Sequence, residues 1–552
     1  MITSAEALAA SAVTLLASAI LSAYLTDWIG LTIAPLAILA ISLIAATAMF
    51  GWLWRRSTRD PAALAAFLAT VAAVLAWLLW LAGRDLLPPG TGPDLTHHLL
   101  LIGYIEQHWR LPHDPQLGGY LGEMLDYTAG SHFLAALAGA WTRTDGLHAV
   151  YPLVAFTVAL KSGMVFLIAR RLVSGDAPSR TPFAAFSVLL LLLPRAYFIG
   201  SFAQHSFLAQ VVSECFVVAM CWALIVWDER PEPTPAACFA LFGAATFLTW
   251  PVWIGPPLIV LAICFVFRRG LPVLERAKQF ALAVAPICAA AALHSAGRTR
   301  SFGIVAVAGF VLRPAPAVFG WAFLLVCGGG VSVGFFNRRT RTIPLLLGAI
   351  ALQAEALAML AHSRGSAAPY LALKMVYLAI YPLAVAGAVG VAALWRVVMR
   401  RAGALAHAVG FARPTALVWA LVALFGIVVV RSVAAVPRPT PTISEPLLQA
   451  GRWARAHIDP SCVDYLVADG YSAYWLHLAV LGNARSAARS IADDTYEPRQ
   501  AIIRWIEPGG LPYAIVEDFS ALPKDIRESV DTVARFGPAA VVKRRGLASC
   551  KE

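Results

Sequence analysis

Charged residues are scarce in this sequence. Asp, Glu, Lys and Arg make up 13% of its 552 residues, whereas a soluble globular domain carries about a quarter. Apolar runs of about twenty residues recur instead, and each is long enough to cross a hydrocarbon core of about 30 Å as a helix. The runs also lack the alternation of apolar and polar residues that is typical of membrane β-barrels. These features exclude a soluble protein and predict an α-helical polytopic membrane protein.

Two further features are missing from the sequence, and they narrow the range of functions. The sequence has no Gly-Lys-Thr phosphate loop, so no nucleotide site is indicated. Its net charge of +12 does not indicate nucleic acid, because Lys and Arg cluster in short blocks between apolar runs, as in cytoplasmic loops. The N-terminus lacks a basic region followed by a clean cleavage site, and we expect no removable signal peptide.

The hydrophobic pattern predicts about thirteen spans. They lie near residues 7–26, 30–54, 61–82, 148–169, 182–199, 206–227, 236–250, 252–267, 279–294, 317–336, 343–361, 369–394 and 414–433. The pair around Trp250-Pro251 is open to a second interpretation, a single broken helix. Arg313-Pro314 favours an interfacial segment before the tenth span.

The basic blocks assign a side to each loop. With these spans every block falls on the same side, which the positive-inside rule assigns to the cytoplasm. The blocks are Arg55-Arg56-Arg59, Arg170-Arg171, Arg268-Arg269-Arg276-Lys278, Arg338-Arg339-Arg341 and Arg396-Arg400-Arg401-Arg413. We therefore expect a plasma (inner) membrane protein with a cytoplasmic N-terminus. The 83–147 segment and everything after about residue 434 lie outside the cytoplasm.

The tail differs in composition from the rest of the chain. A Pro-rich linker, "PRPTPTISEP", divides a membrane domain (1–436) from a soluble extracytoplasmic domain (437–552). Within the tail, "VDYLVA", "YAIVED" and "AAVVKR" are typical of short buried strands. "PLLQAGRWARAHI", "SAYWLHLAVL" and "DIRESVDTVARF" have helical patterns. We expect a small α/β domain, in which a disulfide between Cys462 and Cys550 remains open.

Acids and histidines concentrate in the first outer loop, in the segment that begins "GPDLTHHLLLIGYIEQHW". If Asp94 opens this helix as its N-cap, His97 and His98 lie one turn further on the same side. The alternative is that Asp94 only caps the helix and the histidines are solvated. The density of acids and histidines beside the membrane exceeds what capping requires.

The loop resembles that of the GT-C superfamily of membrane glycosyltransferases, which take a sugar from a polyprenyl-phosphate donor. The likeness lies in the acid of "GPDLTHH", an "IxQHWRLP"-type helix end, and the Tyr-x-x-Gly-x-His pattern in "DYTAGSHFLAALAG". The many spans and the outer C-terminal domain also match. Two extra spans at the N-terminus and the lack of a paired Asp-Glu or Asp-x-Asp at the loop acid depart from the pattern.

The resemblance implies a transfer reaction for which the residues are suited. Asp94 is the expected general base toward the acceptor, which is a glycan, lipid or protein in the cell envelope. Asp126 is a second candidate acid, and Asp114 in "LPHDP" is more typical of a turn. A divalent metal (Mg or Mn) held by Asp94 with His97 or His98 is a further hypothesis.

A second group of polar residues opens the twelfth span, "SAAPYLALKMVYLAIYP". Tyr370, Lys374, Tyr377 and Tyr381 follow helical spacing and share one face. A lysine inside a span is costly and normally faces a cavity or a partner. We interpret Lys374 as a ligand of the donor phosphate, with Tyr370 and Tyr377 beside it. The alternative is a lysine that reaches the outer headgroups.

The turn between the fifth and sixth spans adds two candidates for the lipid phosphate, Arg195 and His205. An anchoring role at the interface is equally compatible with Arg195. Glu214 lies deeper in its span and is expected to pair with another buried polar group. No role is assigned to Lys161.

Three rival functions remain. A transporter or flippase of lipid-linked sugars is disfavoured because no internal repeat is visible and the polar residues gather at one surface. A ligase or polymerase of lipid-linked glycans would carry arginines in its outer loops. A noncatalytic assembly subunit is the third.

Overall fold

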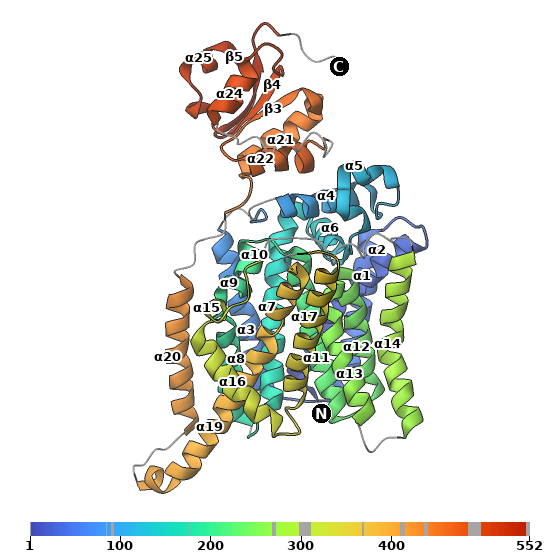
Figure 1. Cartoon of the computed structure of the whole chain (residues 1–552), viewed down its shortest axis with the longest axis vertical. Coiled ribbons are helices and arrows are strands. Elements are labelled where there is room, and N and C mark those ends of the chain that lie inside the picture. Colours follow the sequence, from blue (N-terminus) through green and yellow to red (C-terminus); the bar gives the residue numbers. More distant parts are fainter. Residues whose placement is uncertain are drawn as a thin grey trace.

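The computed structural model describes residues 2–83, 86–89, 93–175, 177–267, 272–296, 311–366, 369–408, 414–434, 440–483 and 498–547. Most of its helices stand side by side in one bundle, and the C-terminal segment forms a separate unit beyond one end of that bundle (Figure 1). The N-terminus lies at the opposite end of the bundle. Arg268, Arg269, Arg413 and Cys550 lie outside the described residues, so predictions that involve them stay predictions.

Eight helical segments in the described ranges are long and apolar enough to cross a membrane. They are α1 (Ser4–Trp28), α2 (Pro35–Trp54), α3 (Pro61–Ala82), α7 (Gly146–Leu172), α11 (Leu208–Glu229), α14 (Val273–Ala296), α17 (Thr342–Ser363) and Tyr370–Arg401, which combines α18 (Tyr370–Tyr377) with most of α19 (Ile380–Ala408). The chain is therefore a multi-pass helical membrane protein, as predicted.

Further apolar helices complete the bundle. One candidate span is bent by 74° between Ser179–Leu191 and Arg195–Ala203, and comprises α8 (Ala177–Leu191), α9 (Arg195–Phe198) and α10 (Gly200–Ala203). Four shorter apolar segments are α12 (Pro233–Thr249), the 3-10 turn η3 (Pro251–Ile254) with α13 (Gly255–Phe267), α16 (Trp321–Phe335), which follows the single turn α15 (Pro316–Phe319), and Ala416–Arg431 within α20 (Pro414–Ala434).

Prolines explain where the helices depart from the predicted spans. The fifth predicted span ends early, at Leu191, because Pro194 disfavours helical geometry at the residue before it. The twelfth is two helices, since the ring of Pro382 clashes with the carbonyl four residues earlier, at Leu378. The boundary at Trp250-Pro251, which both interpretations of this pair share, is present: α12 ends at Thr249 and η3 begins at Pro251.

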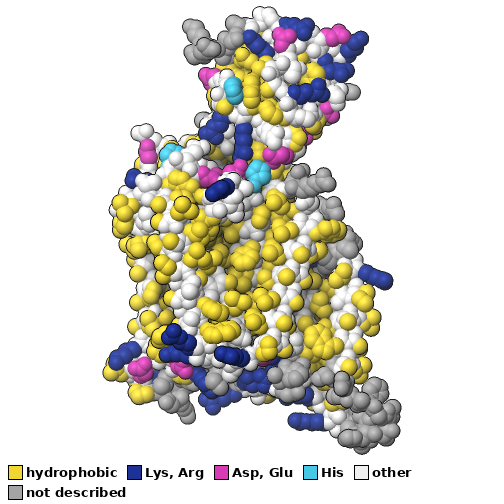
Figure 2. Space-filling model, turned by 180° about the vertical axis from the view of Figure 1, so that it is seen from behind, with side chains coloured by type: hydrophobic (Ala, Val, Ile, Leu, Met, Phe, Trp, Pro, Cys, Tyr) yellow, Lys and Arg dark blue, Asp and Glu magenta, His cyan; other side chains and the backbone are white. Residues whose placement is uncertain are grey.

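Basic and acidic side chains join the helix ends that lie far from the C-terminal unit. Arg171, at the end of α7, pairs with Glu6 at 2.8 Å and with Glu229 at 2.7 Å. Arg341 pairs with Asp228 at 2.7 Å. The short parallel strands β1 (Ile2–Thr3) and β2 (Ser57–Thr58) meet at the same end. Figure 2 shows dark blue side chains there, below a broad hydrophobic surface.

A second polar group lies inside the bundle. Lys161 of α7 donates to the carboxylate of Glu214 in α11, and both side chains are buried. The hydroxyls of Tyr197 and Tyr381 donate to the same carboxylate. Glu214 therefore has the buried partner that the sequence predicts for it, and Lys161 is that partner. These contacts tie α7, α9, α11 and α19 together.

The first outer loop carries short helices. They are α4 (Pro93–His108), the 3-10 turns η1 (Pro115–Leu117) and η2 (Gly122–Asp126), α5 (Gly118–Leu121) and α6 (Gly130–Thr142). The predicted N-cap is wrong: α4 begins at Pro93, so Asp94 lies inside the first turn. Proline suits the first helical position because it has no N–H to leave unpaired.

The C-terminal unit (residues 440–547) contains a four-stranded sheet of order β3-β4-β6-β5. Its elements are α21 (Glu445–His457), η5 (Pro460–Cys462), β3 (Val463–Leu466), α22 (Gly470–Trp475), the π-helical turn η6 (Leu476–Val480), α24 (Pro498–Ile506), β4 (Tyr513–Val516), η7 (Phe519–Ala521), α25 (Lys524–Ser529), β5 (Val530–Phe536) and β6 (Ala539–Arg544). β3 and β4 are parallel, and the other two pairs are antiparallel.

One C-terminal prediction is wrong. "DIRESVDTVARF" was expected to be helical, but only Lys524–Ser529 is helical and Val530–Phe536 forms strand β5. Val530, Thr532 and Val533 favour a strand because their side chains branch at Cβ, and β6 supplies the neighbouring strand. The three predicted strands are all present as β3, β4 and β6.

Candidate active site

Two histidines of the first outer loop form a buried pair. The ring nitrogens His98 Nδ1 and His132 Nε2 are 2.9 Å apart, and the two rings are stacked. Burial lowers the pKa of His98 to about 4; the negative charge of Asp94 opposes this shift, and the positive charge of Lys374 adds to it. Burial also holds the pKa of His132 well below its usual value. Both imidazoles are therefore neutral at physiological pH.

His97 points from the same helix toward different partners. Its Nδ1 atom lies 2.6 Å from the carboxylate of Glu123 in η2. Its Nε2 atom lies 2.9 Å from the hydroxyl of Tyr474 in α22. His97 thus connects the loop to the C-terminal unit, whereas His98 contacts His132 within the loop.

Lys374 lies among aromatic rings. Its ammonium nitrogen is 3.8 Å from the ring centroid of Phe207, 4.2 Å from that of Tyr370 and 5.2 Å from that of Trp250. The side chain is only 3% exposed. Across the described ranges, Lys374 makes no hydrogen bond or ion pair. These rings define the lysine cage (Phe207, Trp250, Tyr370 and Lys374), and a lysine so enclosed does not extend to the headgroups.

Asp94 stands beside this cage. Its side chain is exposed, and within the described part of the chain its carboxylate forms no hydrogen bond or ion pair. It lies close enough for its negative charge to act on Lys374 and to disfavour ionisation of the Tyr370 hydroxyl. The same is true of Asp94 and the buried Tyr127. The predicted acid and the predicted lysine, 280 residues apart in sequence, are therefore brought to one place.

His205 lies next to the lysine cage, whereas Arg195 is not seen to contact it. His205 is half-buried, and burial followed by the charge of Lys374 lowers its pKa. Its ring lies 5.5 Å from that of Phe207, a member of the cage. Arg195 is exposed at the start of α9, and no described contact places it at the cage.

The predicted tyrosine stripe divides into two parts. Tyr370 belongs to the lysine cage, whereas Tyr377 stacks on Tyr197 with centroids 4.1 Å apart and donates to the carbonyl of Leu312 at 2.5 Å. Tyr381 donates to Glu214 deeper in the bundle. Tyr377 and Tyr381 are therefore held by the protein itself, and Tyr370 remains the tyrosine beside Lys374.

The other two acids lie apart from Asp94. Asp114 accepts a hydrogen bond from the backbone N–H of Gln116 at 2.8 Å and caps η1, which is the predicted turn role. Asp126 ends η2 and is half-buried. It is not among the charged groups that act on His98, unlike Asp94 and Glu123.

Asp94 and His98 offer too few ligands for the metal ion that the sequence suggested. The described residues contain no group of three or more His, Cys, Asp or Glu side chains arranged to hold an ion. Magnesium and manganese prefer several oxygen ligands, and one ring nitrogen of His98 is already engaged by His132. Asp94 and His98 therefore do not form a suitable site for magnesium or manganese.

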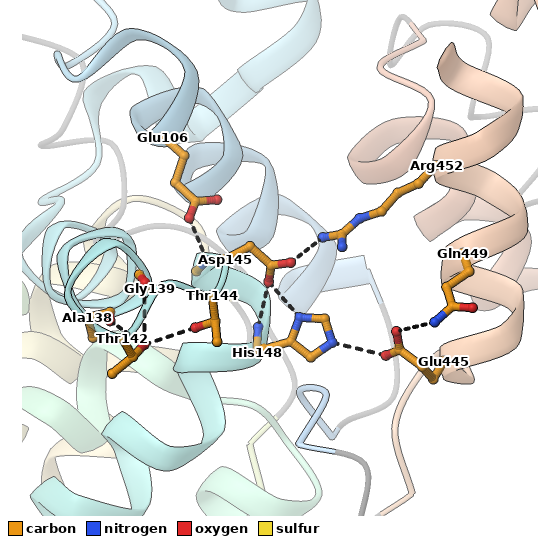
Figure 3. A network of polar contacts seen from close by, with 11 residues as sticks. Glu106, Ala138, Gly139, Thr142, Thr144, Asp145, His148, Glu445, Gln449 and Arg452 are labelled. Carbon is orange, nitrogen blue, oxygen red and sulfur yellow. Dashed lines mark hydrogen bonds and ion pairs between the residues drawn. The ribbon is translucent and has the colours of Figure 1, made fainter. Parts of the chain in front are cut away.

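Polar contacts also join the C-terminal unit to the membrane bundle (Figure 3). Arg452 of α21 pairs with Asp145 at 2.6 Å, and His148 bridges Asp145 at 2.7 Å and Glu445 at 3.0 Å. Partial burial disfavours ionisation of Asp145, but the hydrogen bonds from His148 and Arg452 outweigh it and keep the pKa of Asp145 below its usual value. These contacts hold α21 against the start of α7, with Tyr474 at His97.

The chain was compared with family models, curated proteins and solved structures. No family model and no curated protein matches the chain. Among solved structures, apo ArnT from Cupriavidus metallidurans is 14% identical, with a TM-score of 0.47, and the match covers 86% of this chain and 97% of ArnT.

A second similar structure is the archaeal oligosaccharyltransferase AglB from Archaeoglobus fulgidus, in complex with an inhibitory peptide and a dolichol-phosphate. It is 14% identical, with a TM-score of 0.43, and the match covers 82% of this chain and 69% of AglB. Likeness of this degree supports no conclusion about activity or site residues.

Sequence reasoning missed part of the site. Phe207 and Trp250 complete the lysine cage, and His132 and Tyr474 hold the two histidines. A signal existed for Trp250, since the Trp-Pro break places an aromatic ring at a helix end. A signal existed for His132 in the Tyr-x-x-Gly-x-His pattern. Phe207 and Tyr474 have none, because one apolar or aromatic residue among many is not distinctive.

Proposed function

We propose that this chain is an integral membrane glycosyltransferase. It moves a sugar from a polyprenyl-phosphate donor to a hydroxyl of a glycan, lipid or protein on the extracytoplasmic side. The observation that carries the proposal is Lys374, a buried lysine without an acid partner among the described residues and with the carboxylate of Asp94 nearby. Burying an unpaired charge is costly, and an anionic ligand would offset that cost.

The proposed reaction assigns a task to each residue. Asp94 accepts the proton of the acceptor hydroxyl as its oxygen attacks the anomeric carbon of the donor. The bond between that carbon and the phosphate oxygen breaks, and polyprenyl phosphate leaves with the bonding electron pair. Lys374 stabilises the negative charge that develops on this phosphate. Such electrostatic stabilisation is strongest where water is excluded. Tyr370 contacts Lys374, and His205 lies beside Phe207 of the lysine cage.

A direct test uses the purified full-length protein in liposomes, with a radiolabelled polyprenyl-phosphate sugar and an envelope glycan or lipid fraction as the acceptor. We expect label to move from the carrier lipid to the acceptor, with release of polyprenyl phosphate, and Asp94→Asn liposomes to show almost none. If label crosses the bilayer while still attached to its lipid, the chain is a flippase and not a transferase. A ligase or polymerase would instead move a preassembled glycan.

We further propose thirteen spans, with the N-terminus in the cytoplasm, the membrane domain in 1–436 and the 437–552 domain outside. Alkaline phosphatase fused after residue 440 should be active, because it folds only outside the cytoplasm. The matched control is a fusion at Arg338, between α16 and α17, which should be inactive. If a reporter that works only in the cytoplasm is active after residue 440, the number of spans is wrong by an odd number.

A further inference from the structure

A cavity opens at the end of the bundle far from the lysine cage. Its volume is about 540 Å³. The ends of α2, α7 and α11 and the start of α12 surround it. Its lining includes Leu53, Arg56, Arg171, Val226, Arg230 and Thr234. None of these residues takes part in the reaction proposed above.

Ion pairs and hydrogen bonds link the residues at the floor of the cavity. Arg171 pairs with both Glu6 and Glu229. Glu6 also accepts hydrogen bonds from the indole of Trp222 at 3.0 Å and the backbone N–H of Thr3 at 2.6 Å. Arg339 Nε lies 3.8 Å from Glu229 Oε1 and balances the second carboxylate, although that oxygen accepts no hydrogen bond within the described residues. The floor is therefore already occupied by ion pairs, and the arginines available to a further anion lie at the rim.

The rim is different. Arg56 and Arg230 are exposed, and within the described ranges neither has a carboxylate partner. The guanidinium of Arg56 lies 4.0 Å from the ring centroid of Trp52 and donates to the hydroxyl of Thr234 at 3.2 Å. These two contacts orient Arg56 toward the mouth of the cavity and leave other N–H groups available. Glu232 is an acid at the same rim.

The start of α12 also lies at this rim. The helix spans 17 residues from Pro233, and its N-cap Glu232 makes no side-chain capping hydrogen bond. The carboxylate of Glu232 therefore already lies at the positive end of the helix dipole, and the groups that suit phosphate at this rim are the arginines, which offer a fork of donors. Leu53, Val226 and the buried Cys238 make the inner wall apolar. An amphipathic anion therefore complements this cavity.

We propose that this cavity binds the phosphate headgroup of an anionic phospholipid from the leaflet opposite the C-terminal unit. Arg56 and Arg230 hold the phosphate, and the acyl chains run along α2, most of whose surface is not covered by the protein. Basic pockets between membrane helices recognise such headgroups. The inference rests on the membrane fold and is independent of the proposed transfer reaction.

The test is native mass spectrometry of the delipidated full-length protein, titrated with phosphatidylglycerol or with phosphatidylcholine of the same acyl chains. We expect wild type to prefer phosphatidylglycerol. The double variant Arg56→Gln/Arg230→Gln should bind it about 10- to 100-fold more weakly, since two charge-assisted contacts are lost. Both side chains are exposed, so folding should be retained, which gel filtration checks.

The matched control is Arg338→Gln/Arg400→Gln, which removes the same charge from exposed sites that do not line the cavity. It should bind phosphatidylglycerol within twofold of wild type. Equal weakening in both double variants, or no preference for phosphatidylglycerol in wild type, overturns the proposal. Inorganic phosphate is the last probe. If it raises the melting temperature of wild type but not of the Arg56/Arg230 variant, while phosphatidylglycerol does not bind, the ligand is a free anion and the lipid proposal is wrong.

Discussion

Asp94→Asn is expected to lower kcat by about 10²- to 10⁴-fold, the usual contribution of a general base. The amide cannot accept the acceptor's proton, but it preserves the size of the side chain. Asp94 is exposed and makes no hydrogen bond or ion pair among the described residues, so the protein should stay folded and bind donor normally. Transfer kinetics together with a donor-binding assay measure both effects.

Two acids of the same loop provide controls for this experiment. Asp114→Asn removes only the cap of a short turn and should retain near-normal turnover. Asp126→Asn should also retain most of its activity, because no described contact brings Asp126 to the lysine cage. Turnover by the Asp94→Asn protein above about a tenth of the wild-type rate means that Asp94 is not the base, and Asp126 then becomes the candidate.

Lys374→Met should raise the apparent donor KM and reduce kcat. Methionine fills the space of the lysine stem among the rings of the cage, so that the loss is mainly one of charge. A phosphate contact worth about 2–3 kcal/mol corresponds to a drop in kcat/KM of roughly 30- to 150-fold. Steady-state kinetics over a range of donor concentrations separate the effect on KM from the effect on kcat.

Lys543→Met is the comparison for this substitution. Lys543 also lies near an aromatic ring, with its ammonium 5.7 Å from the centroid of Tyr513, but it belongs to β6 of the C-terminal unit. Its removal should leave kcat/KM within twofold of wild type. If Lys374→Met behaves in the same way, Lys374 has no role in donor binding.

Local patterns predicted much of this architecture. A membrane span depends on the hydropathy of its own residues, so the apolar runs located the helices with small errors at their ends. The helical repeat placed Tyr370 and Lys374 on one face, and the two are in contact. Proline caused the larger errors: Pro194 and Pro382 break helices that hydropathy alone treats as continuous.

Strand pairing in the C-terminal unit was also beyond what local sequence patterns predict. β5 was predicted as part of a helix because "DIRESVDTVARF" has apolar residues at helical spacing. The strand forms because β6 offers hydrogen-bonding groups along its edge, and such a partner is not visible in a short window of sequence. Tertiary context decided this segment, as it often does where strand and helix preferences are close.

The sequence by itself determined the membrane class, the approximate spans, the candidate acid and the candidate lysine, because each depends on composition or on spacing within one segment. Only the tertiary structure decided which groups meet. Phe207 and Trp250 come from separate segments to enclose Lys374, and Lys161 reaches Glu214 from a neighbouring helix. Helix-to-helix contacts depend on how side chains of both helices interlock. That information is distributed over the whole bundle, which is why no single segment reveals it.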